Sequence, residues 1–126
     1  MTTTKRTILI ADDDTRFLGA LRTRLIAEGF EVATAQDAYQ AIDIARRKRP
    51  DLLVLDVNMP AGNGFSVQER LKNIAGLQET PVIFVTGDCS VLSQSTMHPG
   101  TDVLRKPFDT AELLSAVWEK LDPIDL

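Results

Sequence analysis

Apolar and polar positions divide the chain into alternating segments of two kinds. Five short runs consist mainly of apolar and β-branched residues, which is typical of strands in a buried parallel sheet. Between them lie stretches in which apolar residues recur every three or four positions, as they do in amphipathic helices. The pattern predicts five strands, at Thr7–Ala11, Glu31–Ala35, Leu52–Asp56, Pro81–Thr86 and Asp102–Arg105.

Four helices are predicted from the helical spacing. Asp14 or Thr15 can cap the first helix, and Gly29 ends it. Gly64 opens the third helix. The apolar positions expected to face the core are Phe17, Leu18, Leu21 and Leu25 in the first helix, Ala38, Ala41, Ile42 and Ala45 in the second, Phe65, Val67 and Leu71 in the third, and Leu113, Leu114, Val117, Trp118 and Leu121 in the last.

Two of these helices begin with the signature of a capping box. In this motif a capping side chain is followed three residues later by Glu or Gln, as at Asp37–Gln40 and Asp109–Glu112. The segment Gly87–Gly100 has no clear pattern, since it is rich in Ser and Thr and has few apolar positions. A short helix and an irregular loop both remain open there.

Strands and helices alternate along the whole sequence, which favours a parallel sheet covered by helices on both faces. The length of 126 residues suits one domain. No linker, repeat or low-complexity segment interrupts the pattern. We therefore expect a single α/β domain.

Composition narrows the class of protein further. The net charge of −4 argues against nucleic acid as a direct partner, because phosphate binding needs a basic face. No apolar run has membrane-spanning length, and no signal peptide precedes the first strand, so we expect a cytoplasmic protein without membrane contact. A single cysteine excludes an internal disulfide and a thiolate metal cluster.

Polar residues whose side chains could bind a ligand or take part in a reaction follow four of the predicted strands. Asp12 and Asp13 come after the first strand, Asp56 ends the third, Thr86 ends the fourth and Lys106 follows the fifth. Ligands of open α/β sheets bind at the carboxyl ends of the strands. If these strands are neighbours, three carboxylates, a hydroxyl and an ammonium group meet in one crevice.

This set of groups suits phosphoryl chemistry. Three close carboxylates repel one another unless a cation joins them, and Mg²⁺ is a hard ion that takes oxygen ligands and keeps room for phosphate oxygens. Lys106 and Thr86 would contact a phosphoryl group by charge and by hydrogen bond. Phosphoryl transfer depends mainly on positioning and charge neutralisation. Asp56 lies between the acid pair and the lysine in chain order, and is the best-placed nucleophile.

The ordered motifs identify a family resemblance. They are Ile8–Asp13, Asp56 through Asn58-Met59-Pro60 to Asn63-Gly64-Phe65, Val85–Gly87 and Lys106–Phe108. Together they resemble the receiver domain of two-component response regulators, over nearly the whole chain. The resemblance implies a doubly wound, flavodoxin-like α/β fold with five parallel strands in the order 2-1-3-4-5. It also implies a single receiver domain over residues 1–126, with a core at about 7–122 and no output domain.

The resemblance also implies roles for individual residues. Asp56 would accept a phosphoryl group from a phosphohistidine of a sensor histidine kinase or histidine phosphotransfer protein. Thr86 and Lys106 would contact the phosphoryl oxygens, and the Lys106–Pro107 bond is expected to be cis. The protein would catalyse only its own phosphorylation and dephosphorylation, and would signal through protein contacts. A homodimer is one assembly that the resemblance allows, and the sequence does not name the downstream target.

Four oxygen donors are implied as the metal ligands. Asp12, Asp13 and Asp56 would hold Mg²⁺ together with the backbone carbonyl of Asn58. One departure from the family pattern concerns the position three residues before the lysine, where receivers usually carry an aromatic residue. Here that residue is Val103.

Two other functions compete with this interpretation. A receiver-like module that binds partners without phosphorylation is left open by Val103. A phosphatase of the haloacid-dehalogenase type also uses an aspartyl nucleophile and Mg²⁺, in an Asp-x-Asp motif at the first strand. Asp12-x-Asp14 matches that motif, but it is followed by Arg16 where that family has a hydrophobic residue or threonine.

Overall fold

Five parallel strands form one sheet in the order β2-β1-β3-β4-β5. The computed structural model describes residues 5–87, 98 and 100–122. The strands are β1 (Thr7–Ala11), β2 (Glu31–Ala35), β3 (Leu52–Asp56), β4 (Val82–Thr86) and β5 (Thr101–Arg105). The predicted fold class and strand order are confirmed.

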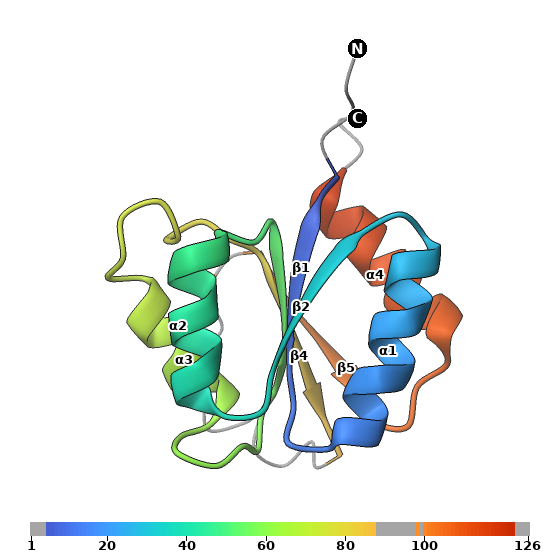
Figure 1. Ribbon diagram of the computed structural model, residues 1–126, viewed down its shortest axis with the longest axis horizontal. Helices are drawn as coiled ribbons and strands as arrows, with labels where there is room; N and C mark the ends of the chain where they lie inside the picture. Colours follow the sequence, from blue (N-terminus) through green and yellow to red (C-terminus); the bar gives the residue numbers. More distant parts are fainter. Residues whose placement is uncertain (1–4, 88–97, 99, 123–126) are drawn as a thin grey trace.

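Four helices cover the two faces of this sheet in the described residues. They are α1 (Thr15–Ala27), α2 (Ala38–Lys48), α3 (Gly64–Leu71) and α4 (Thr110–Leu121). Helices α1 and α4 lie on one face, and α2 and α3 lie on the other (Figure 1). The site discussed below therefore rests on a three-layer scaffold whose central strands are fully buried.

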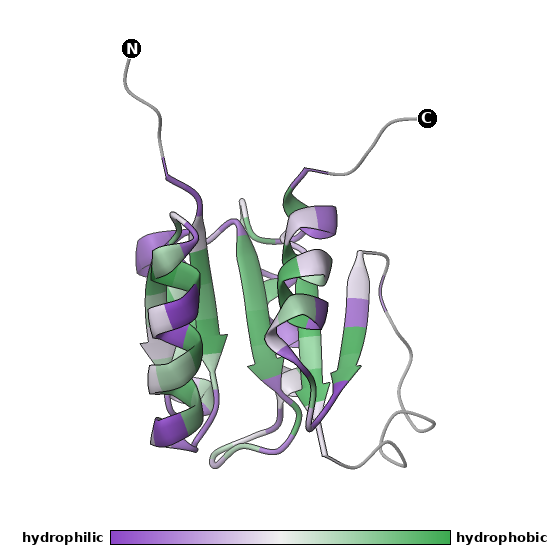
Figure 2. Ribbon diagram, turned by 90° about the vertical axis from the view of Figure 1, so that its right-hand side faces the viewer, coloured by the Kyte–Doolittle hydropathy of each residue, from purple (hydrophilic) through white to green (hydrophobic). Residues whose placement is uncertain are grey.

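The core explains why the middle strands are so apolar. Every residue of β3 and β4 is buried, because helices cover both sides of these strands. Alternate residues belong to two clusters, with Leu53 and Phe84 on the side of α2 and α3, and Val54 and Ile83 on the side of α1 and α4. Figure 2 shows the apolar colouring concentrated on the strands. This packing fixes the ends of the strands, where the polar residues lie.

The helix starts follow the predicted capping chemistry with small differences. Asp14, rather than Thr15, is the N-cap of α1, and its carboxylate accepts hydrogen bonds from the amides of Arg16 and Phe17. Asn63 caps α3 through the amide of Ser66, a cap that the sequence pattern did not reveal.

Asp37 and Asp109 are the N-caps of their helices, as predicted, but the return bond of a capping box to the amide of the cap residue is recorded at neither helix in the described residues. The Asp37 carboxylate accepts from the Gln40 amide at 2.8 Å. The Gln40 side chain reaches back to the amide of Gln36, one residue before the cap. At α4 the Asp109 carboxylate accepts from the Ala111 amide at 2.8 Å. Side-chain oxygens thus replace the missing carbonyl partners of the first turn.

The strand boundaries differ from the prediction by one residue at two places. Strand β4 begins at Val82 instead of Pro81, because proline has no amide hydrogen to donate to the ladder. Strand β5 begins at Thr101, which pairs with Val82. Most of the Gly87–Gly100 segment, residues 88–97 and 99, lies outside the described residues, so neither alternative for it is tested. Within the described ranges, no helix is long and apolar enough to span a membrane.

Candidate functional site

The predicted site residues meet at the carboxyl edge of the sheet. Strands β1 and β3 are neighbours, with Ala11 paired to Leu55, so Asp12 and Asp56 lie side by side. Strand β4 follows β3 in the sheet, and Thr86 pairs with Arg105 of β5. The backbone amide of Lys106 donates to the carbonyl of Thr86 at 2.7 Å. Strand order alone therefore assembles residues from both ends of the chain.

Three carboxylates form the centre of the site. Asp12, Asp13 and Asp56 each offer one oxygen, and these oxygens lie within 4.8 Å of one another. Asp12 and Asp56 are buried, whereas Asp13 is exposed. Like charges at this separation repel one another strongly in a buried setting. Oxygen donors from carboxylates are the ligands that Mg²⁺ prefers, so this donor set fits that ion.

Lys106 supplies the positive charge in the described part of the site. Its Nζ donates to Oδ2 of Asp12 at 2.7 Å and lies 4.0 Å from Oδ2 of Asp56. The other oxygen of Asp12 accepts from the amide of Asp14 at 2.9 Å. Both oxygens of Asp12 are therefore already engaged, and the ammonium group lies between this carboxylate and Asp56. The Lys106–Pro107 bond is cis, as expected.

The environment of Asp56 favours its protonated form. Its Oδ1 accepts a long hydrogen bond, 3.4 Å, from the amide of Asn58. Burial, assisted by the nearby charge of Asp12, raises the pKa of Asp56 from 3.8 to about 6, although Lys106 acts in the opposite direction. A carboxylate with these neighbours is held at a cost in stability, and a cation bound beside it would lower that cost.

We expect Asp56→Asn to stabilise the metal-free protein above about pH 6. The folded state binds more protons than the unfolded state between the two pKa values, so the free energy of unfolding falls as the pH rises through this window. The asparagine variant does not lose this stability, and the difference is on the order of 3 kcal/mol. Urea unfolding of both proteins across this pH range measures the effect. A stability difference that does not shrink below about pH 4 would contradict it.

Thr86 and Val103 occupy neighbouring strands. Thr86 ends β4 and is fully buried, directly beside the β5 residue that precedes Lys106. Val103 pairs with Phe84 and packs against the cluster under α2 and α3. The place of the usual aromatic residue is thus filled by a small side chain that contributes to the core.

Gly64 lies where the chain returns to the site after β3. Its amide donates to the carbonyl of Val57 at 3.0 Å. A Cβ at this position would lie 2.6 Å from the backbone oxygen of Asp56 and 3.2 Å from the ring of Phe84. Glycine is required by close approach of the backbone, a role beyond the helix start that the sequence indicated.

Phe17 is a neighbour of the site that the sequence pattern marked only as a core position. The Lys106 Nζ lies 4.4 Å from the centre of the Phe17 ring, within the range of a cation–π contact. Phe17 also meets Phe108 edge to face, with ring centres 5.9 Å apart. An open pocket of about 440 Å³ is lined by Phe17, Lys106, Pro107 and Phe108.

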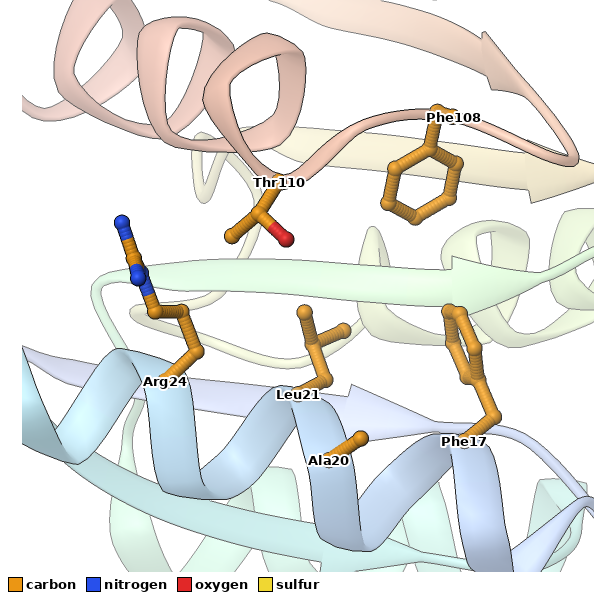
Figure 3. Close-up of a pocket in the computed structure, with 6 residues that line it drawn as sticks. All are labelled: Phe17, Ala20, Leu21, Arg24, Phe108 and Thr110. Carbon is orange, nitrogen blue, oxygen red and sulfur yellow. The ribbon is translucent and has the colours of Figure 1, made fainter.

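The same two aromatic residues also line a second pocket, which extends along α1. Figure 3 shows Phe17 on α1 and Phe108 before the start of α4 at this second pocket, which Leu21 and Arg24 also line. The signal that could have marked Phe17 is its place one turn after the acidic pair, on the helix that begins beside the site. No residue type in the sequence shows by itself which apolar side chain of α1 covers the lysine.

Comparison with known proteins identifies the family. The model of the response regulator receiver domain matches residues 8–118. Transcriptional regulatory protein PrrA of Mycobacterium tuberculosis is 39% identical over 112 residues, which cover 87% of this chain and 47% of PrrA. Response regulator PleD of Caulobacter vibrioides is 36% identical over 115 residues, which cover 87% of this chain and 25% of PleD. The chain thus spans half or less of the length of these curated relatives.

Solved structures agree with this assignment. The chemotaxis response regulator CheY4 of Vibrio cholerae superposes with a TM-score of 0.86 at 28% identity, and the match covers 94% of this chain and all of CheY4. The receiver domain of the hybrid histidine kinase CckA superposes with a TM-score of 0.79 at 29% identity, covering 92% of this chain and 99% of that one. Fold, motif order and sequence similarity therefore agree, and the chain belongs to the receiver domain family of two-component response regulators.

Proposed function

We propose that Asp56 is the phosphoryl acceptor of this receiver domain. The observation that carries the proposal is a buried carboxylate at the end of β3, with two further carboxylates and an ammonium group grouped around it. An oxygen of Asp56 attacks the phosphorus of a phosphohistidine and forms a P–O bond. The P–N bond breaks, and its electron pair stays on the imidazole nitrogen, which takes up a proton from water.

The residues beside Asp56 have separate roles in this proposal. The Lys106 ammonium balances the negative charge of the phosphoryl oxygens, since it lies near Asp56 on a long stem. Thr86 donates a hydrogen bond to one of those oxygens from the adjacent strand. Asp12 holds the lysine at 2.7 Å in the unphosphorylated protein.

Asp12, Asp13, Asp56 and the backbone carbonyl of Asn58 would hold Mg²⁺. When bound, the ion neutralises charge on the transferred phosphoryl group. Asp13 is the exposed member of the cluster, whereas both oxygens of Asp12 are engaged by Lys106 and the Asp14 amide. We therefore assign the more direct contact to Asp13 and a weaker one to Asp12.

The donor in this proposal is a sensor histidine kinase or a histidine phosphotransfer protein, as the receiver family implies. The domain changes only its own phosphorylation state and passes the signal on through protein contacts. It does not turn over a separate substrate.

The test is labelling by acetyl phosphate, a small donor that needs no partner protein. We expect wild-type protein to gain the mass of one phosphoryl group in the presence of Mg²⁺, and Asp56→Asn to gain none, because the asparagine amide is not a nucleophile for phosphorus. Intact-mass spectrometry measures both. Asp43→Asn is the matched control, since Asp43 is exposed on α2 and paired with Arg47.

Two results would count against this function. Equal labelling of wild type and Asp56→Asn would exclude Asp56 as the acceptor. A folded wild type that gains no phosphoryl group with Mg²⁺ and donor in excess would favour a binding module that works without phosphorylation.

A further inference from the structure

We propose that Phe17 is a positioning residue for phosphoryl transfer, because its ring holds the Lys106 ammonium between Asp12 and Asp56. This inference rests on the proposed function of Asp56. It assigns to an apolar residue of α1 a part in the chemistry of a site otherwise built from polar groups at strand ends.

Three contacts surround the ammonium group. Asp12 accepts its hydrogen bond at 2.7 Å, Asp56 lies 4.0 Å away, and the Phe17 ring centre lies 4.4 Å away. The face of an aromatic ring carries partial negative charge and attracts a cation. The ring thus adds attraction for the ammonium without adding another carboxylate, which would compete for the metal or repel the phosphoryl group.

The lysine needs such restraint because of its surroundings. Its side chain remains 27% exposed, and it borders the open pocket of about 440 Å³ that Phe17 and Phe108 also line. A lysine stem has many rotamers, so an unrestrained ammonium would spend much of its time in that pocket or in water. The ring limits these excursions and keeps the charge beside Asp56.

Phe17 is itself fixed by packing. It meets Phe108 edge to face and lies partly buried against the cluster under α1 and α4. The N-cap of α1, Asp14, directly follows Asp12 and Asp13, so the position of Phe17 in the first turn is fixed relative to these two carboxylates. The ring is therefore held rigidly on the helix that begins at the site.

Loss of the ring should change two quantities in opposite directions. In Phe17→Leu, labelling of Asp56 by acetyl phosphate should slow about two- to fivefold, as expected from one cation–π contact. Mg²⁺ should bind tighter by a similar or smaller factor, because the ammonium repels the ion less when it leaves the site. A purely structural role would weaken both, since loosened carboxylates bind the ion less well.

Three further variants separate the contact from general packing. Phe17→Tyr keeps an aromatic face and should restore both quantities. Phe108→Leu removes the ring that meets Phe17 but no ring above the ammonium, so its effect should be smaller than that of Phe17→Leu. In a Lys106→Met background, Phe17→Leu should add no further change, because a positioning residue has nothing left to position.

The measurements are acetyl phosphate labelling rates by intact mass and Mg²⁺ affinity by calorimetry. The proposal is overturned if Phe17→Leu leaves both unchanged, if it lowers both together, if Phe108→Leu matches it, or if its effect persists without Lys106. If wild-type protein is not labelled at Asp56, the proposed function fails. The Mg²⁺ titrations with and without Lys106 still decide whether Phe17 acts on the ammonium.

Discussion

Gly64→Ala is expected to destabilise the protein by about 2–3 kcal/mol, because overpacking of a well-packed site forces the backbone to move. The added methyl group would lie 2.6 Å from the backbone oxygen of Asp56, and no side-chain rotation relieves such a contact. The displacement falls on the residue proposed to accept the phosphoryl group. We therefore also expect weaker Mg²⁺ binding in the variant. Urea unfolding and calorimetry measure the two effects.

Gly19→Ala is the matched control for this substitution. Gly19 is exposed within α1, and a Cβ there would meet no atom within 4 Å. Alanine in a helix interior is favoured over glycine by about 0.5–1 kcal/mol, so this variant should be more stable than wild type. If both alanine variants shifted stability in the same direction, the close approach at Gly64 would not be the cause.

Lys106→Met is expected to separate metal binding from phosphoryl transfer. Methionine keeps most of the length of the stem but removes the charge beside Asp12 and Asp56. Mg²⁺ affinity should rise on the order of tenfold, because a positive charge a few ångströms from the ion is lost. Labelling of Asp56 should slow on the order of 100-fold, the usual effect of removing one group that stabilises developing charge.

Lys120→Met provides the same change in net charge away from the site. Lys120 pairs with Asp102 at 3.4 Å, near the start of β5 and at the opposite end of that strand from Lys106. We expect little change in either quantity for this variant. A fall in Mg²⁺ affinity on loss of Lys106 would contradict the proposed arrangement, because it would mean that the lysine holds the carboxylates in place more than it repels the ion.

Much of this architecture could be predicted from the sequence, because buried strands appear as apolar runs and the polar residue after each run marks the end of the strand. The apolar run in Leu52–Asp56 predicted a central strand, and the aspartate that ends it marked the carboxyl end of the strands, where the site lies. The family resemblance then supplied the strand order. The strand ends and the strand order together are enough to predict that Asp12, Asp56 and Lys106 lie close to one another, as they do in the structure.

The remaining features depend on distances that no pattern records. The need for glycine at position 64 arises from the path of the chain back toward Asp56, which only the folded backbone defines. The contact of Phe17 with Lys106 joins an amphipathic helix to a loop far along the sequence. The same apolar spacing would have placed a leucine there with no visible change in the pattern.

The pairing of Lys106 with Asp12 has a consequence for the biosynthesis of the protein. The two residues are separated by 94 positions, and the lysine follows the edge strand β5 whereas the aspartate follows β1, inside the sheet. Chains emerge from the ribosome with the N-terminus first, so the acidic groups and the acceptor appear well before the ammonium group. Under the proposed chemistry, an unfinished or frayed molecule holds the acceptor without the charge that supports transfer. Phosphoryl uptake should then be on the order of 100-fold slower in such molecules than in chains whose last strand has docked, as is expected for Lys106→Met.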